Sequence, residues 1–258
     1  MLKTQIKDEA RIVSSRNSYS SCFWDSIRSA VLRKIVNDDI SDFASWDEIN
    51  KTMYVSNIHG YVKNEYDYIK DKEYLKNTSK NKLKHETLYN GVCSNTIHML
   101  YHIQRFTDVT GVNLKSFKSV IEFGGGFGNM CKVIKNQNNE IDYTIFDFEE
   151  FNLLQRYYLN ENNISDTKFC NTIQTLENRQ YDLLVATWSL SEAPRNIRED
   201  FLGGIKASNF LIAYQGSFEG VNNNEFFNYM SSSISEIKWY NIPIEHIGNQ
   251  NYLFGVKK

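Results

Sequence analysis

Ser119-Val-Ile-Glu-Phe-Gly-Gly-Gly-Phe-Gly128 is the most informative segment of this 258-residue sequence. Residues 119–123 form a short apolar run typical of a buried strand, and the glycines after it predict a tight turn. A helical pattern follows over residues 129–135. A strand that ends in glycines and leads into a helix exposes main-chain amides at the positive helix end, where a polar or anionic ligand can approach them.

Downstream of this turn, short apolar segments alternate with helical patterns, as in an α/β sheet. Further strands are predicted at residues 141–147, 167–170, 183–187, 209–214, 237–242 and 252–256. Helices are predicted at residues 149–159, 196–205 and 224–234. The last two strands are joined by a turn containing Gly248 and Asn249, which predicts a closing hairpin. We therefore expect a Rossmann-like sheet of seven strands, parallel except for one antiparallel strand.

The part before residue 118 is polar and helical in pattern and contains no proline. Residues 20–36 and 95–110 have the apolar spacing of amphipathic helices, and the second places His98, His102 and Arg105 on its polar side. We expect residues 1–117 to form a helical cap and substrate lid, and residues 118–258 to form the ligand-binding core.

Composition excludes several classes of protein. Lys and Arg number 29 against 31 Asp and Glu, so the basic excess needed for a nucleic-acid partner is missing. The four cysteines have no paired spacing and are expected to be reduced thiols. Because the N-terminus is polar and no apolar run reaches the ~20 residues of a membrane span, we expect a cytoplasmic protein. The sequence leaves the oligomeric state open, a homodimer included.

The glycine turn favours one nucleotide cofactor over another. Glu122 precedes a GxGxG pattern from Gly124 to Gly128, whereas the dinucleotide fingerprint GxGxxG does not fit. Asp147 ends the next predicted strand, where an acid can bind both ribose hydroxyls of any adenosine ligand. S-adenosyl-L-methionine is the predicted cofactor. The residues predicted to bind it are Glu122, Gly124, Gly125, Gly126, Gly128, Asp147, Phe148 and Trp188. Phe148 and Trp188 fit equally well as core aromatic residues.

Three stretches resemble the class I adenosylmethionine-dependent methyltransferases, and more narrowly the bacterial sugar O-methyltransferase family found among surface-glycan genes. They are Val120-Ile-Glu-Phe-Gly-Gly-Gly-Phe-Gly128, Tyr143-Thr-Ile-Phe-Asp-Phe-Glu-Glu-Phe-Asn-Leu-Leu-Gln-Arg-Tyr-Tyr-Leu159 and Tyr181-Asp-Leu-Leu-Val-Ala-Thr-Trp-Ser-Leu-Ser-Glu192. The family commonly has a proline where this chain has Glu149. The resemblance implies methyl transfer to a saccharide or sugar-linked group during surface-polysaccharide synthesis.

A hydroxyl acceptor needs a base, and three residues are candidates. Glu192 follows the fourth predicted strand at the edge where ligands of this fold bind, although a carboxylate near a helix start is an equally good reading. His98 and His102 lie one helical turn apart and could serve as base and orienter, or simply face solvent. We predict no metal site, because the spacing lacks HExxH and an acid cluster. His85 and His246 are taken as structural.

Two other functions remain compatible with the sequence. An NAD-dependent oxidoreductase or epimerase is disfavoured by the missing third glycine and by the lack of a Tyr-xxx-Lys pair after the fourth strand. A catalytically silent adenosine-binding protein would keep the glycine turn without needing a base.

Overall fold

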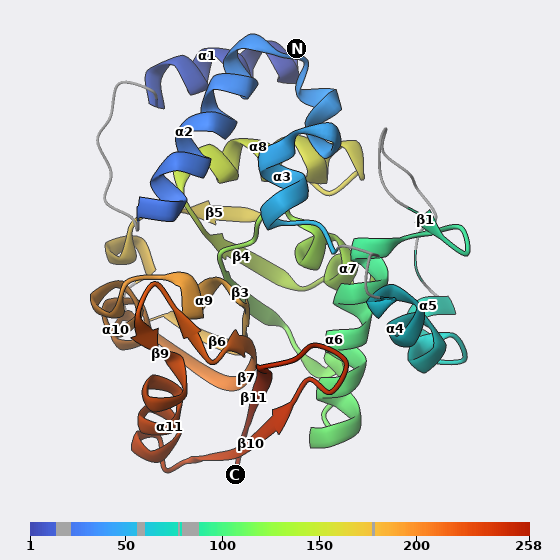
Figure 1. Ribbon diagram of the computed structural model, residues 1–258, viewed down its shortest axis with the longest axis vertical. Coiled ribbons are helices and arrows are strands. Elements are labelled where there is room, and N and C mark those ends of the chain that lie inside the picture. Colours follow the sequence, from blue (N-terminus) through green and yellow to red (C-terminus); the bar gives the residue numbers. More distant parts are fainter. Residues whose placement is uncertain (14–21, 56–59, 77, 79–87, 177–178) are drawn as a thin grey trace.

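A computed structural model describes residues 1–13, 22–55, 60–76, 78, 88–176 and 179–258 of the chain (Figure 1). Its centre is one seven-stranded sheet. The strands are β3 (Ser119–Phe123), β4 (Asp142–Phe146), β5 (Lys168–Cys170), β6 (Arg179–Thr187), β7 (Ile205–Gln215), β10 (Ile237–Pro243) and β11 (Gln250–Lys257). Their order is β10-β11-β7-β6-β3-β4-β5, and β11 is the one strand of this sheet that runs opposite to the other six. The predicted Rossmann-like sheet with its closing hairpin is confirmed.

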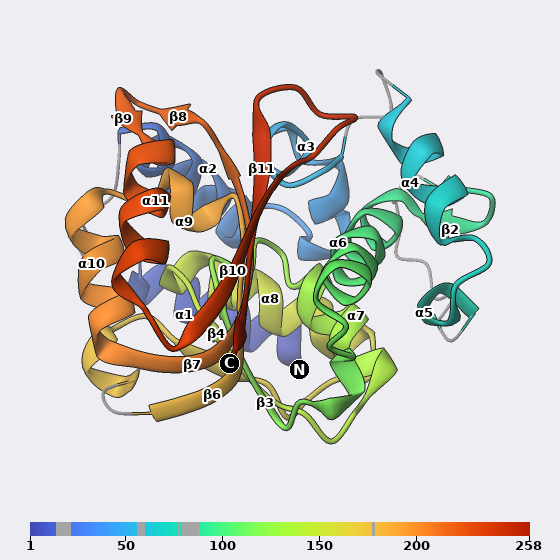
Figure 2. The same cartoon turned by 90° about the horizontal axis from the view of Figure 1, so that it is seen from below.

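Helices cover both faces of this sheet (Figure 2). One face carries α6 (Ser94–Thr110), α7 (Asn129–Gln137) and α8 (Glu149–Glu161), and the other carries α9 (Ser189–Glu192), α10 (Arg195–Gly204) and α11 (Asn223–Ser233). Neighbouring strand residues point to opposite faces: Val120 and Leu183 join the cluster under α6 to α8, while Ile121 and Leu184 join the cluster under α9 to α11. This two-sided burial explains why the strands are continuous apolar runs.

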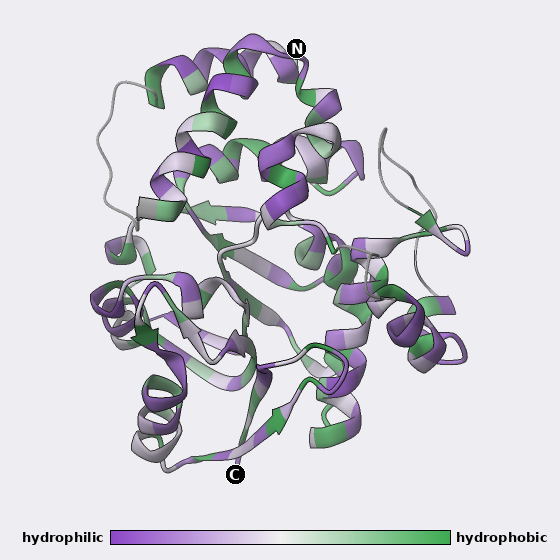
Figure 3. Cartoon of the chain, in the orientation of Figure 1, coloured by the Kyte–Doolittle hydropathy of each residue, from purple (hydrophilic) through white to green (hydrophobic). Residues whose placement is uncertain are grey.

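The N-terminal part adds α1 (Leu2–Val13), α2 (Cys22–Asn37), α3 (Asp47–Thr52), α4 (Tyr61–Ile69) and α5 (Glu73–Lys76). Helices α1 and α2 pack on α8, and α4 packs on α6 (Figure 1). Hydrophilic residues dominate the outer surface of α1 and α4 (Figure 3). Their inner residues, such as Ile6 and Val62, join the core's own cluster. Phe43, in the short 3-10 helix Ile40–Ser45, also joins it and packs against Tyr158 with ring centroids 5.9 Å apart. That residues 1–117 act as a lid stays a prediction.

Short elements depart from the sequence prediction. The hairpin of β1 (Leu88–Tyr89) and β2 (Val92–Cys93), the hairpin of β8 (Ser217–Phe218) and β9 (Val221–Asn222), and the helix α9 were all missed. Strand β6 begins at Arg179, whereas the sequence predicted residue 183. Arg179 and Gln180 are polar and exposed, so they lie outside the apolar run that the prediction relied on. Within the described residues no helix is long and apolar enough to cross a membrane.

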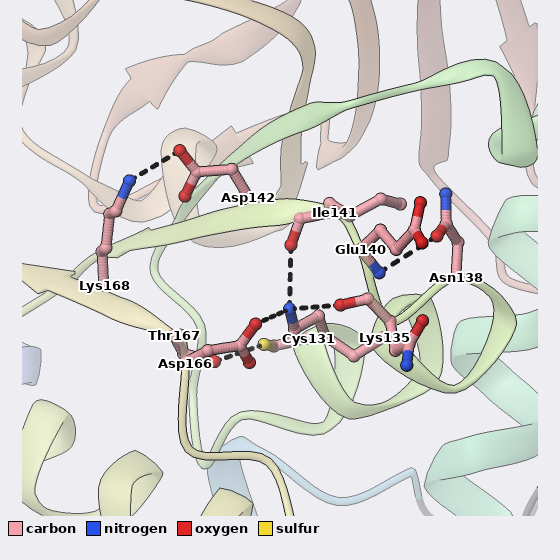
Figure 4. Close-up of polar contacts among 10 residues, drawn as sticks. Cys131, Lys135, Asn138, Glu140, Ile141, Asp142, Asp166, Thr167 and Lys168 are labelled. Carbon is pink, nitrogen blue, oxygen red and sulfur yellow. Dashed lines mark hydrogen bonds and ion pairs between the residues drawn. The ribbon is translucent and has the colours of Figure 1, made fainter.

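Lys135 fixes the connection between α7 and β4 (Figure 4). Its buried ammonium donates to the carbonyls of Asn139 and Ile141, both at 2.9 Å, and to Asp166 at 2.5 Å. Nearby, Cys131 contacts the Thr167 hydroxyl at 3.4 Å, and burial raises the pKa of its thiol. Cys93, Cys131 and Cys170 are free thiols, and the side chain of Cys22 lies outside the described residues.

Candidate functional site

The glycine turn after β3 has the geometry that its sequence demands. Gly124, Gly126 and Gly128 have φ values of +69°, +57° and +99°, a region that side chains with a Cβ rarely adopt. A Cβ on Gly124 would lie 2.4 Å from the Cβ of Ser189. The turn after β3 and the segment after β6 can therefore approach this closely only because residue 124 has no side chain. Gly128 is the residue before α7 and leaves the start of that helix facing the turn.

A cavity of about 690 Å³ lies over this turn, at the carboxyl ends of β3, β4 and β6. Its size is that of a small-molecule site, roughly 300–1,000 Å³. Cap residues such as Met53, Tyr54 and Tyr61 form its other wall. Nine of the predicted site residues line it: Glu122, Gly124, Gly125, Gly126, Asp147, Phe148, Trp188, Glu192 and His98. The lining does not include Gly128 or His102.

Asp147 follows β4 and faces the cavity with 8% of its surface exposed. One carboxylate oxygen accepts from the main-chain N–H of Phe148 at 2.8 Å, and the other accepts from Gln155 Nε2 at 2.6 Å. Burial raises the pKa of Asp147 to about 7. A carboxylate has about four acceptor positions, so Asp147 can still accept from ligand hydroxyls.

Gln155 was missed by the sequence prediction. It projects from α8, is fully buried, and donates both to Asp147 and to the Gly126 carbonyl at 2.9 Å. The same side chain therefore holds the acid and the glycine turn in register. Residues 171–174 were also missed, although they follow the third parallel strand at the ligand-binding edge and line the cavity.

Glu122 lies beneath the glycine turn and is 2% exposed. Its carboxyl accepts from the Tyr143 hydroxyl at 2.8 Å, and burial raises its pKa to about 8. The group therefore carries a proton through much of the neutral range and can donate to a ligand or to the backbone.

Trp188 is held in an unusual conformation at the end of β6, with φ +63° and ψ −36°. Its N–H donates to the Ala213 carbonyl at 2.7 Å, and its indole N–H donates to Gln250 at 2.5 Å. Residues that several contacts hold in a strained backbone conformation occur most often at functional sites. Trp188 lines the cavity, and its indole is stacked on the ring of His98, with centroids 5.3 Å apart.

Glu192 ends α9 and lines the cavity. Burial raises its pKa, an effect partly opposed by hydrogen bonds from Gln215 and Trp24. The Gln215 amide lies 3.2 Å from one carboxylate oxygen. Acceptor capacity remains on this carboxylate, which suits a group that takes a proton.

His98 and His102 do not face solvent, so that reading of their helix face was wrong. They are 4% and 0% exposed, because α4 and β11 cover the side of α6 that carries them. The Nε2 atoms of the two rings lie 3.0 Å apart, His98 Nδ1 lies 2.7 Å from Glu65, and His102 Nδ1 lies 2.5 Å from the Tyr252 hydroxyl. All four ring nitrogens are thus engaged within the protein, and burial lowers the pKa of His102 well below its usual value.

His246 also belongs to this network, since its Nε2 lies 2.7 Å from Glu65, whereas His85 lies outside the described residues. Among the side chains that the structure describes, no group of three or more His, Cys, Asp or Glu could hold a metal ion.

The charge of the lining is one-sided. Glu122, Asp147 and Glu192 contribute three carboxyl groups, and the described lining contains no Lys or Arg. Such a cavity suits a cationic or neutral ligand. For a pyrophosphate, the described lining offers main-chain amides but no Lys or Arg, and the carboxyl groups would oppose its charge as they ionise.

No protein-family model and no curated protein matches this sequence. Solved structures share the fold at low similarity. A SAM-dependent methyltransferase from Aquifex aeolicus has a TM-score of 0.44 and 10% identity, over 54% of this chain and 81% of that one. The 16S rRNA methylase ArmA has a TM-score of 0.42 and 21% identity, over 63% and 86%. The mitomycin 7-O-methyltransferase MmcR has a TM-score of 0.46 and 10% identity, over 64% and 57%. Similarity this low leaves the chemistry of the site as the basis for a function.

Proposed function

We propose that this chain is an S-adenosylmethionine-dependent O-methyltransferase that acts on a saccharide or sugar-linked hydroxyl during bacterial surface-polysaccharide synthesis. The observation that carries the cofactor is the combination of an open glycine turn with three cavity carboxyl groups and no Lys or Arg in the described lining. Adenosylmethionine, when bound, supplies an electrophilic methyl group on a cationic sulfonium. As these carboxyl groups ionise, they attract this cation and disfavour the negatively charged pyrophosphate of NAD.

The protein's own residues have distinct roles in this proposal. The bare amides of the glycine turn and the start of α7 bind the polar end of the cofactor, and Asp147 accepts from its ribose hydroxyls. Glu192 removes the proton of the acceptor hydroxyl as the new bond forms. The cap holds the acceptor in line and excludes water from the site.

The saccharide rests on the sequence resemblance and is supported by the cavity walls. Trp188, which follows β6, and Tyr61, which belongs to the cap, both line the cavity. Flat aromatic faces of this kind can pack against the apolar face of a sugar ring.

Calorimetry with adenosylhomocysteine, adenosylmethionine and NAD tests the cofactor. Both adenosyl ligands should bind and NAD should not. Asp147→Ala should weaken binding by about 1.5–3 kcal/mol, because charge-assisted hydrogen bonds to the ribose are lost. Asp142→Ala is the matched control, since Asp142 starts the same strand and its one ion pair among the described residues is with Lys168 at 2.6 Å (Figure 4).

Transfer of a labelled methyl group from adenosylmethionine to a bacterial glycan extract tests the activity. Binding of NAD in preference to adenosylhomocysteine would overturn the cofactor assignment in favour of an oxidoreductase. Cofactor binding without transfer to the extract would overturn the saccharide and favour either another acceptor or a silent adenosine-binding protein.

A further inference from the structure

Glu65 lies behind the cavity wall and is the centre of a buried polar cluster. It projects from α4 and is fully buried, but it does not line the cavity. A single carboxylate oxygen contacts two imidazoles, His98 Nδ1 on α6 and His246 Nε2 in the β10–β11 connection, both at 2.7 Å. One side chain thus joins three segments that are far apart in the sequence.

Stability alone does not account for a carboxylate at this position. The second oxygen of Glu65 has no hydrogen-bond partner among the described residues, and its described ion pairs are only to histidines. Although burial raises its pKa, the neighbouring His98 and His246 lower the pKa of Glu65 to about 2, so the group remains charged. A buried charge with an orphan oxygen is costly, and replacing a whole buried polar cluster by well-packed apolar residues is often no less stable.

The two histidines that contact Glu65 pack against two aromatic residues of the cavity wall. The His98 ring is stacked on Trp188, with centroids 5.3 Å apart and an interplanar angle of 15°. The His246 ring packs edge-on against Tyr61, with centroids 5.8 Å apart. Both Trp188 and Tyr61 line the cavity.

We propose that Glu65 is a positioning residue for the acceptor: by accepting hydrogen bonds from His98 and His246 it holds Trp188 and Tyr61 in the orientation that the acceptor ring requires. This inference rests on the proposed function only in taking the wall formed by Trp188 and Tyr61 as part of the acceptor site. The two histidines then serve as parts of the wall, since their nitrogens are already engaged. Small errors in acceptor placement are expensive, because about 1 Å of displacement can cost about a hundredfold in rate.

Two variants separate positioning from folding. Glu65→Leu keeps the volume and removes both hydrogen bonds, whereas Glu65→Gln keeps an oxygen that can accept from both rings. The matched control is Glu9→Gln, because Glu9 on α1 also ties the cap to the core, through Arg156 on α8, and neither residue lines the cavity.

Trp188 emission reports the wall without any acceptor. It is measured as the difference between each chain and the same chain carrying Trp188→Phe. We expect Glu65→Leu to change this emission, because the imidazole no longer lies flat on the indole, and Glu65→Gln and Glu9→Gln to leave it unchanged. Identical emission in a folded Glu65→Leu chain and the wild type would overturn the inference.

Methyl transfer to the glycan extract gives the second readout. Glu65→Leu should lose about tenfold to a hundredfold in transfer while its adenosylhomocysteine affinity stays at the wild-type value, and Glu65→Gln should restore most of the transfer. Equal losses in Glu65→Leu and Glu65→Gln would show that the charge, not the positioning, matters. A wild-type chain that fails to bind adenosylhomocysteine would remove the proposed function and leave the emission comparison standing.

Discussion

Glu192 differs from the two histidines of α6 because its carboxylate keeps acceptor positions while every nitrogen of His98 and His102 is engaged. We therefore expect Glu192→Gln to lower methyl transfer by about 10²–10⁴-fold, since an amide cannot take the hydroxyl proton. Adenosylhomocysteine affinity, measured by calorimetry, should not change.

The pH profile sharpens this prediction. Burial raises the pKa of Glu192, so wild-type transfer should rise with pH as the carboxylate forms, and the variant should lack that rise. Glu199→Gln is the control, because Glu199 pairs with Arg195 on the exposed side of α10. Wild-type transfer by Glu192→Gln would show that another group is the base.

Sequence patterns identify residues whose role depends on the local backbone. They do not identify residues whose role depends on contacts with residues far away in the sequence. Gly124 and Asp147 could be found because a strand end fixes their place. Gln155 bonds a carbonyl 29 positions away, and Glu65 meets a histidine 181 positions away, so no local pattern marks either residue. The helical pattern also misjudged His98, because it cannot show that a second helix covers the polar face of α6.

At the scale of elements, α2 and α8 are joined by a buried ion pair beside the cavity. Arg28 donates to both oxygens of Glu150, at 2.9 and 3.2 Å, and its guanidinium lies 3.9 Å from the ring centroid of Phe148, which lines the cavity. Both charged side chains are less than a tenth exposed. This contact fixes the cap on the helix that follows the ribose acid.

Arg28→Met should therefore destabilise the chain by about 3–5 kcal/mol, because it leaves Glu150 buried without its counter-charge. Urea unfolding measures the loss. The double variant with Glu150→Met should recover much of it, since the unpaired charge is removed. Arg33→Met, at an exposed position of the same helix, is the control. A double variant less stable than Arg28→Met would contradict this account of the pair.

Most long elements were predicted from the sequence and most short ones were not, although three-residue β5 was predicted and twelve-residue α1 was not. The strands flanking the glycine turn and the helices α6, α8 and α11 carry enough residues to show a period. A four-residue helix such as α9, or a two-residue strand such as β8, carries none. These short elements form because of the sheet edge beneath them, and α9 is the one that brings Glu192 to the cavity.

The whole molecule buries acidic groups between its cap and its sheet. Burial raises the pKa of Glu122 to about 8 and that of Asp147 to about 7, above their ordinary values of 4.5 and 3.8. In the absence of ligand, the unfolded chain therefore loses these protons at a lower pH than the folded chain does. The free energy of unfolding from these groups is therefore greatest in acid and falls as the pH rises from about 4 to about 8.

A cationic ligand should reverse this trend, and the two adenosyl ligands provide a matched comparison. Adenosylmethionine and adenosylhomocysteine share the amino acid and adenosine groups and differ in the sulfonium charge. Because the cavity carboxyl groups ionise between about pH 6 and 9, the melting temperature gained from adenosylmethionine should exceed that from adenosylhomocysteine by a margin that grows with pH. Thermal melts at saturating ligand across this range measure the margin. In Glu122→Gln the margin should increase less with pH, since one of the titrating groups is gone. A margin independent of pH in the wild type would show that these carboxyl groups do not face the sulfonium.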